Sequence, residues 1–371
     1  MKKCLICEGF VKEQSIFKTL PRVTSDCKPF PVGGTLSVCK TCSLVQKYND
    51  SKWNNEIKSI YKNYTIYSLA NGSEQLIFTD DGAFPRSQKL VDYFLNTVSV
   101  PSEGELIDLG CGNGAALNNF SKRLEKWKFD GFELDDRNLF SYKKILNFRD
   151  LICSNNDLIP SKYDIISAIH SLEHVPNPIQ FLENIHKIAK PNCKILIQVP
   201  NMMTSTFDVL VADHLTHFTP ETLTFLIEKT GFEVISFSDK ILPKEITMII
   251  KKAKKTRVSD MKTKINLDNF IKDQLEWLQD LIIKAEEYSN NVEKFGVFGT
   301  SISAMWIYGK IGKNIKFFVD EDPTKVGKNV DDINILHPND VPNNSQILVP
   351  LTPEIRSKII NRLSGEGTIY F

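Results

Sequence analysis

A glycine-rich turn constrains the fold of this chain more than any other segment. Asp108-Leu-Gly110-Cys-Gly112-Asn-Gly114 follows a strand-like apolar segment and precedes a segment that is predicted to be helical. Glycines in such a turn let the backbone approach a ligand, and the start of the next helix presents free N–H groups to it. The three glycines are therefore expected to contact a cofactor. Their spacing, with Ala115, also satisfies the dinucleotide fingerprint, so the turn alone leaves the cofactor open.

Short apolar strands alternate with helical segments around this turn. Such alternation is typical of a mostly parallel sheet covered by helices, so we predict an α/β fold. The strands expected in the middle of the chain lie at 105–110, 128–134, 163–169 and 194–200. A second alternating unit has strands at 293–299, 315–322 and 345–351, with a helix starting near residue 301.

The 371 residues predict two or three domains. We expect a small module at 1–70, a cofactor-binding domain at 71–255 and a third part at 256–371. The Lys-rich segment 251–260 is interpreted as a solvated linker. Helical spacing of apolar residues over roughly 265–292 predicts a long helix that leads into the second α/β unit.

Acidic residues near the glycine turn favour S-adenosylmethionine as the cofactor. Asp108 lies two residues before the first glycine, where it can meet an ammonium group, and Glu133 ends the next strand, where an acid can bind both ribose hydroxyls. Asp157, with Asn156, precedes the fourth strand and can contact an adenine amino group. This pattern resembles the class I methyltransferase fold. A plain glycine-rich turn without a ligand is the alternative.

Two CxxC pairs predict a metal site in the first 70 residues. Cys4 and Cys7 form one pair, Cys39 and Cys42 the other, and four thiolates at such spacing complete a tetrahedral zinc site. With all four positions filled by protein, the zinc would be structural rather than catalytic. Reduced buried thiols, or a redox-active pair, are the alternatives. Cys27 is expected to pack rather than to bind the metal.

Two histidine segments follow the predicted fourth and fifth strands. His174 lies in Glu-His-Val-Pro, and Asp213-His214 lies a short way beyond the fifth strand. A histidine there can act as a general base at neutral pH. We predict His214 as the base, with His174 and Asp213 in support, against the alternative of ordinary polar loops. His170 completes an H-x-x-E-H pattern, but without an obvious third ligand we expect no zinc protease there.

The order of these motifs resembles the sugar C-methyltransferase family, which includes the C-3′ enzymes of antibiotic deoxysugar pathways. The C-terminal stretch VFGTSISA…FFVDEDPTKVGK…ILHPNDV…ILVPL looks like the G-x-G-A…VVD-x-N-P-x-K-x-G…I-x-P domain of that family. The resemblance covers essentially the whole chain. It implies a small N-terminal zinc-binding module, a class I methyltransferase core of Rossmann-like type and a C-terminal Rossmann-like α/β domain. It places the active site between the middle and C-terminal domains.

The resemblance also implies an acceptor. In that family a histidine in a Y-x-E-H loop removes a proton beside the carbonyl of a nucleotide-linked 4-keto sugar, and the resulting enolate takes the methyl group. Here the loop reads Val211-Ala212-Asp213-His214, which keeps the histidine and replaces the glutamate by Asp213. A Gly-Gly-Ser/Glu-x-Arg loop near the sugar is replaced by PKEIT at 243–247. These departures lie on the acceptor side.

Other functions remain open from the sequence. His214 could equally serve O-methylation of a surface-polysaccharide sugar or its nucleotide precursor, or the scaffold could be a non-catalytic binding protein. A nicotinamide-dependent oxidoreductase is disfavoured because Gly296-x-x-Gly299 lacks the full fingerprint. The net charge of +1 gives no support to nucleic acid or an anionic membrane as a partner. With no signal-like segment and paired cysteines suited to metal, a cytoplasmic location is expected.

Overall fold

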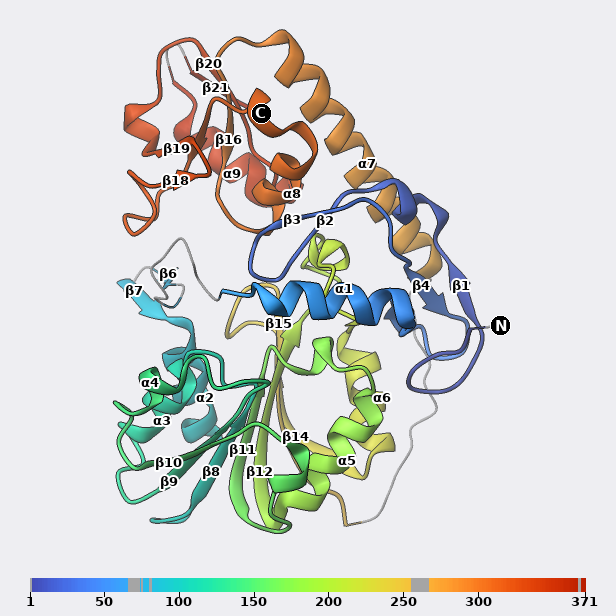
Figure 1. The fold of residues 1–371 in the computed structure, drawn as a ribbon, viewed down its shortest axis with the longest axis vertical. Helices are drawn as coiled ribbons and strands as arrows, with labels where there is room; N and C mark the ends of the chain where they lie inside the picture. The colour runs from blue at the N-terminus through green and yellow to red at the C-terminus, as the bar shows by residue number, and fades with distance from the viewer. Residues whose placement is uncertain (1, 66–73, 75, 80–81, 255–266, 366–367) are drawn as a thin grey trace.

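The computed structural model describes residues 2–65, 74, 76–79, 82–254, 267–365 and 368–371, and Figure 1 shows how they are arranged. In these residues three larger sheets occur, with seven, six and four strands. In Figure 1 the six-stranded sheet lies at the top and the seven-stranded sheet at the bottom, with helix α1 (Ser51–Lys62) crossing between them. A separate hairpin pairs β6 (Leu76–Thr79) with β7 (Gly82–Pro85).

The seven-stranded sheet has the order β10-β9-β8-β11-β12-β15-β14. Its first five strands are parallel, and β15 pairs antiparallel with both β12 and β14. The order reverses between β8 and β11, and in open α/β sheets ligands bind at such a switch point, outside the carboxyl ends of the strands. The bounds are β8 (Glu105–Leu109), β9 (Lys128–Phe132), β10 (Phe148–Ile152), β11 (Tyr163–Ile169), β12 (Ala189–Pro200), β14 (Phe232–Ser238) and β15 (Glu245–Lys252).

Helices cover both faces of this sheet because successive residues of a strand point to opposite sides. Leu106 packs with residues of α2 (Arg86–Thr97) and α3 (Ala115–Ser121). Ile107, the next residue of β8, packs with α5 (Pro178–Ile188) and α6 (Pro220–Lys229). The short α4 (Leu139–Tyr142) lies beyond β9 in the chain. The predicted central strands and the α/β class are confirmed.

The four-stranded sheet belongs mainly to the N-terminal module, but its last strand comes from far downstream. Its order is β1-β4-β5-β13, from β1 (Val11–Glu13), β4 (Ser37–Cys39), β5 (Val45–Gln46) and β13 (Thr216–His217). Thr216 pairs with Gln46, and His217 pairs with Val45. A second hairpin, β2 (Arg22–Val23) with β3 (Pro29–Phe30), projects from the module. The segment around His214 is therefore held by the module's own hydrogen bonds.

The C-terminal part begins with the long helix α7 (Leu267–Asn291), which confirms the helix predicted at 265–292. It shares one apolar core with Phe17 of the module and with Trp306 of α8 (Ile302–Ile311). Of the predicted linker, Lys251 and Lys252 end β15, and residues 255–260 lie outside the described residues. The sheet comprises β16 (Phe295–Phe298), β17 (Phe317–Val319), β18 (Asn329–Val330), β19 (Ile333–Leu336), β20 (Ser345–Leu348) and β21 (Thr368–Tyr370), beside α9 (Pro353–Leu363).

Short 3₁₀ turns lie between the longer elements, and two of them carry predicted site residues, Asp157 in η3 and His174 in η4. The turns are η1 (Ser15–Thr19), η3 (Asn155–Asp157), η4 (Leu172–His174), η5 (Asp208–Leu210), η6 (Gly312–Asn314) and η7 (Pro338–Asp340).

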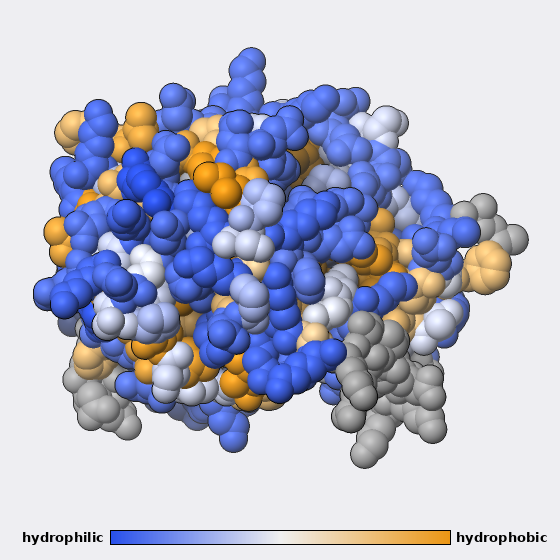
Figure 2. All heavy atoms as spheres, turned by 90° about the horizontal axis from the view of Figure 1, so that it is seen from below, coloured by the Kyte–Doolittle hydropathy of each residue, from blue (hydrophilic) through white to orange (hydrophobic). Residues whose placement is uncertain are grey.

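Figure 2 shows one face of the molecule, on which hydrophilic side chains predominate and apolar ones are scattered. Among the helices of the described residues, none is long and apolar enough to cross a membrane.

Candidate active site

The glycine turn lies at the carboxyl end of β8, at the switch point of the sheet. Gly110, Gly112 and Gly114 have φ of 77°, 55° and 81°, in the left-handed region that side chains disfavour. A Cβ on Gly110 would overlap the Ser171 hydroxyl, and one on Gly114 would lie 2.9 Å from Tyr142. Both the conformation and the surrounding atoms therefore require glycine, which fits a turn that holds a ligand close to its backbone.

Glu133 follows β9 and turns its carboxylate back to the glycine turn. Its Oε2 accepts a hydrogen bond from the Gly112 amide at 2.9 Å, and Oε1 accepts one from the Leu134 amide at 2.9 Å. The structure thus brings this predicted ribose ligand to the predicted turn. The residues present fit the ribose end of S-adenosylmethionine.

Asp108 lies beneath the turn and is almost fully buried. Its Oδ1 accepts a hydrogen bond from the Ser167 hydroxyl at 2.7 Å. Burial is the main cause that raises the pKa of Asp108 to about 7, because the charged form loses its hydration. An ammonium group brought next to this carboxyl would stabilise its ionised form.

Asp157 lies in η3 and is exposed to solvent. Its backbone amide bonds to the Ser154 carbonyl at 3.1 Å, which fixes the turn. Within the described residues, no contact of its side chain tests the role that the sequence assigns to it, so binding of adenine by Asp157 stays a prediction.

His174 and His214, predicted from two separate segments, lie against each other. Their ring centroids are 4.5 Å apart and the ring planes are nearly perpendicular, at 86°. His174 Nδ1 lies 3.1 Å from the Tyr61 hydroxyl and 3.4 Å from Asp213 Oδ2. Burial alone would lower the pKa of His174, but the bond to Asp213 outweighs it and raises that pKa. The structure therefore assembles all three predicted catalytic residues.

Asp208 is the residue of this group that the sequence analysis missed. Its Oδ1 lies 2.6 Å from His214 Nδ1, and its Oδ2 lies 2.5 Å from His217 Nδ1. Burial alone would raise the pKa of Asp208, but the two histidines outweigh it and hold that pKa well below its usual range. Asp208 is thus an ionised carboxylate that orients both rings. The spacing D-x₅-H-x₂-H was the only signal in the sequence.

The N-terminal module supplies further partners to the His214 segment. The Ser25 amide donates to Asp213 Oδ1 at 2.8 Å, and the Ser25 hydroxyl donates to Oδ2 at 2.5 Å. Trp53 Nε1 donates to the Ala212 carbonyl at 3.2 Å, and the Lys47 ammonium reaches the His214 carbonyl at 2.6 Å. No local pattern marks these residues. The expected site lies between the middle and C-terminal domains; the structure adds that residues of the N-terminal module contact the His214 segment.

A second polar cluster lies at the carboxyl end of β11. Arg86 Nη2 lies 2.8 Å from His170 Nε2 and 2.9 Å from Glu245 Oε1, and His170 Nδ1 lies 3.0 Å from Glu173 Oε1. His170 has a φ of 51°, a left-handed conformation that is uncommon for a side-chain-bearing residue. Glu173 is fully buried, and its Oε2 has no hydrogen-bond partner in the described residues. The cluster borders the histidines because Glu173 precedes His174.

The four predicted metal ligands come together in the module. One sulfur from each of Cys4, Cys7, Cys39 and Cys42 lies within 4.8 Å of the others, and the Cys4–Cys42 and Cys7–Cys39 sulfurs are 3.4 Å apart. Tetrahedral zinc with Zn–S bonds of about 2.3 Å places its sulfurs nearly 4 Å apart. The quartet therefore fits a closed four-sulfur site with small adjustments.

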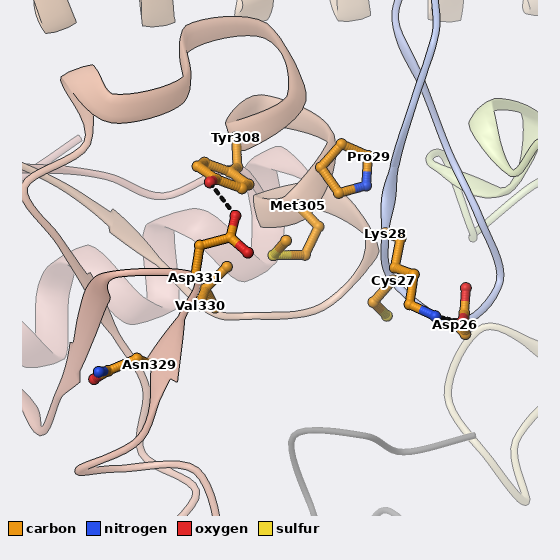
Figure 3. A pocket seen from close by; sticks show the side chains of 9 residues that line it. All are labelled: Asp26, Cys27, Lys28, Pro29, Met305, Tyr308, Asn329, Val330 and Asp331. Atoms are coloured by element: carbon orange, nitrogen blue, oxygen red, sulfur yellow. Dashed lines mark hydrogen bonds and ion pairs between the residues drawn. The ribbon is translucent and has the colours of Figure 1, made fainter. Parts of the chain in front are cut away.

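A cavity of about 200 Å³ lies between the module and the C-terminal part, and Figure 3 shows its lining. Cys27 and Lys28 line one side, Met305 and Tyr308 the other, and the Tyr308 hydroxyl donates to Asp331. Asp26 also lines the cavity, and the preceding residue, Ser25, donates to Asp213. The cavity is thus connected to Asp213 through Ser25 and Asp26, which are neighbours in the chain.

Comparison with known proteins agrees with this geometry over the middle of the chain. Residues 83–237, less than half of the chain, match a family described as methyltransferase domain. The mitochondrial ubiquinone biosynthesis O-methyltransferase of Dictyostelium discoideum is 31% identical over 124 residues, which cover 29% of this chain and 38% of that protein. The ubiquinone biosynthesis O-methyltransferase of Vibrio cholerae is 21% identical over 155 residues, which cover 38% of this chain and 62% of that protein.

Among solved structures, a SAM-dependent methyltransferase from Aquifex aeolicus superposes with a TM-score of 0.40 at 17% identity, covering 46% of this chain and 94% of that one. This chain spans between 38% and 62% of the length of the two curated relatives. The sheet with its switch point, the glycine-only turn and the family match identify residues 83–237 as a class I S-adenosylmethionine-dependent methyltransferase domain.

Proposed function

We propose that this chain is an enzyme that methylates an acceptor held beside His214. The observation that carries the proposal is the Asp208–His214 pair. Asp208 occupies Nδ1 of the ring, which leaves Nε2 available to take a proton from an acceptor. His214 also lies close to the cofactor turn. Its ring contacts the ring of His174, and Ser171, three residues before His174, packs against Gly110.

The cofactor site in this proposal is formed by the predicted residues. Gly110, Gly112 and Gly114 let the backbone meet the ligand, Glu133 takes the ribose hydroxyls, Asp108 the ammonium group and Asp157 the adenine. S-adenosylmethionine supplies an electrophilic methyl carbon when it is bound. The protein orients the acceptor in line with that carbon and holds the base.

The proposed acceptor is a nucleotide-linked keto sugar that is methylated on carbon. His214 removes the proton from the carbon beside the carbonyl and keeps it on Nε2. That carbon would form the new bond to the methyl group while the methyl–sulfur bond of the donor breaks, leaving a neutral thioether. His174, whose pKa Asp213 raises, can donate a hydrogen bond to the developing oxyanion. His217 cannot, because both of its ring nitrogens lie against Asp208 and Lys47. The cavity beside Asp26 is the place for the nucleotide.

Methylation on oxygen is the second candidate, and the curated relatives favour it because both are named O-methyltransferases. His214 would then take the proton from a hydroxyl group, with no enolate to stabilise. The four cysteines hold one structural zinc ion in either version of the proposal.

A labelled-methyl screen tests the proposal. The protein is incubated with methyl-¹³C S-adenosylmethionine and with nucleotide-linked keto sugars, the matching hydroxy sugars and simple catechols. The ¹³C shift of the product separates attachment to carbon from attachment to oxygen. We expect turnover on a keto sugar that is lost in His214→Asn and kept in the control His337→Asn. Tight cofactor binding without turnover on any acceptor class would instead support a non-catalytic binding protein.

A further inference from the structure

Lys47 is a buried lysine of the N-terminal module whose ammonium group contacts residues of the proposed active site. It directly follows β5, and only 1% of the residue is exposed. Its Nζ lies 2.5 Å from the Val211 carbonyl, 2.6 Å from the His214 carbonyl and 3.3 Å from His217 Nε2. An ammonium group has three N–H donors and no acceptor, so these three partners use its full capacity.

These contacts determine the protonation of the neighbouring rings. As long as Lys47 is an ammonium group it can only donate, so His217 Nε2 accepts and His217 carries its proton on Nδ1. His217 Nδ1 then donates to Asp208 Oδ2 at 2.5 Å, and His214 Nδ1 donates to Asp208 Oδ1 at 2.6 Å. The result is a His214 ring with a bare Nε2, which is the form that a base needs.

Of the two neighbouring bases in this hydrogen-bonded group, Lys47 carries the positive charge and His217 does not. Two backbone carbonyls face Nζ, and only the lysine can donate to them. Burial lowers the pKa of Lys47 to about 7, whereas burial and the lysine charge lower the pKa of His217 further, to about 4. The other charged groups that act on Lys47 are Asp208, Asp213, Arg22 and Glu56.

We propose that Lys47 is a positioning residue that fixes both the place and the ring tautomer of His214, through its backbone carbonyl and through His217 and Asp208. Two of its hydrogen bonds hold the backbone at Val211 and His214. The third begins the series of hydrogen bonds through His217 and Asp208 that leaves His214 Nε2 without a proton. This proposal rests on the proposed function of His214 as the base. Ring tautomers, however, can be measured without any turnover, so the two ideas fail separately.

The direct test uses protein with ¹⁵N-labelled histidine and long-range ¹H–¹⁵N spectra that report the tautomer of each ring. In the unaltered protein we expect protonated Nδ1 and bare Nε2 at both His214 and His217. A wild-type His217 protonated on Nε2 would overturn the proposal without any variant. In Lys47→Met we expect the His217 and His214 signals to move or to split between tautomers.

Kinetics and stability separate positioning from folding. We expect kcat of Lys47→Met to fall by about 100-fold with KM for S-adenosylmethionine unchanged, since displacing a catalytic group by about 1 Å costs that much. Lys18→Met, on the exposed side of the module, is the matched control and should keep full activity. Lys47→Gln serves if the methionine variant does not fold. Unchanged histidine spectra alongside a lower kcat, or unchanged kcat alongside altered spectra, would each refute the positioning role.

Discussion

His214 Nδ1 lies 2.6 Å from Asp208 Oδ1, and both side chains are almost completely removed from solvent. Replacing Asp208 by asparagine keeps the shape but leaves an amide that cannot accept from both rings. We expect kcat to fall by about 100-fold or more, because the His214 tautomer is no longer fixed. The affinity for S-adenosylmethionine, measured by calorimetry, should stay within about twofold. Asp239→Asn on the surface is the control, and equal kcat in both variants would remove Asp208 from the mechanism.

The buried Asp108 predicts a pH dependence of cofactor binding. Its pKa of about 7 means that the carboxyl is protonated in the free protein below that pH, while an ammonium group prefers the ionised form. Binding should therefore release a proton below pH 7, and affinity should fall by up to about tenfold per pH unit there. Calorimetry from about pH 5.5 to about pH 8.5 measures both the affinity for S-adenosylmethionine and the protons released on binding. A flat profile would show that Asp108 does not meet the ammonium group.

The same carboxyl predicts a change in stability. Aspartate in the unfolded chain ionises near pH 3.9, below the native value of about 7, so the native state binds more protons between these values. The contribution of Asp108 to the free energy of unfolding therefore decreases as the pH rises from about 4 to 7. Asp108→Asn should be at least as stable as the unaltered protein at pH 8, by urea denaturation, and should bind the cofactor more weakly. A clear loss of stability at pH 8 would contradict the assignment.

Gly110 offers a steric test of the cofactor turn. Gly110→Ala places a side chain on left-handed backbone and against the Ser171 hydroxyl, so we expect the free energy of unfolding to drop by about 1–3 kcal/mol. The double variant with Ser171→Ala should recover the part due to overlap but not the backbone part. Urea denaturation of the two variants measures both parts. A double variant no better than Gly110→Ala would mean that Ser171 does not confine the turn.

Metal removal should reach the active site through the shared sheet. Cys39→Ser removes one of four sulfurs, and we expect zinc content to fall from one ion per chain to none and Tm to drop, since such sites contribute folding energy directly. Methyl transfer should be lost with it, because β13 pairs with β5 of the module. Cys153→Ser, an exposed cysteine far from the quartet in sequence, is the control. Full activity of zinc-free protein would separate the metal from the active site.

The sequence predicts the parts of the site that are built locally. The turn at Gly110 and the strands beside it can be predicted because the turn, its strand and its helix are continuous in the chain. The two cysteine pairs are recognised from their CxxC spacing. Glu133 is found because strand ends can be located from apolar segments. Lys47 and Ser25 are not, since their partners lie more than 160 positions away. Lysine is normally exposed, so no sequence rule selects one that is buried.

The strand β13 has a consequence for engineering. The segment that carries His214, the proposed base, belongs to the middle part by its place in the chain and to the N-terminal module by its hydrogen bonds. A fragment trimmed to residues 83–237 would therefore keep the glycine turn and lose the hydrogen bonds from the N-terminal module that hold the His214 segment. To exchange acceptor preference between related enzymes, the amino-terminal module and the 208–218 loop would have to be transferred together, because they are hydrogen-bonded to each other.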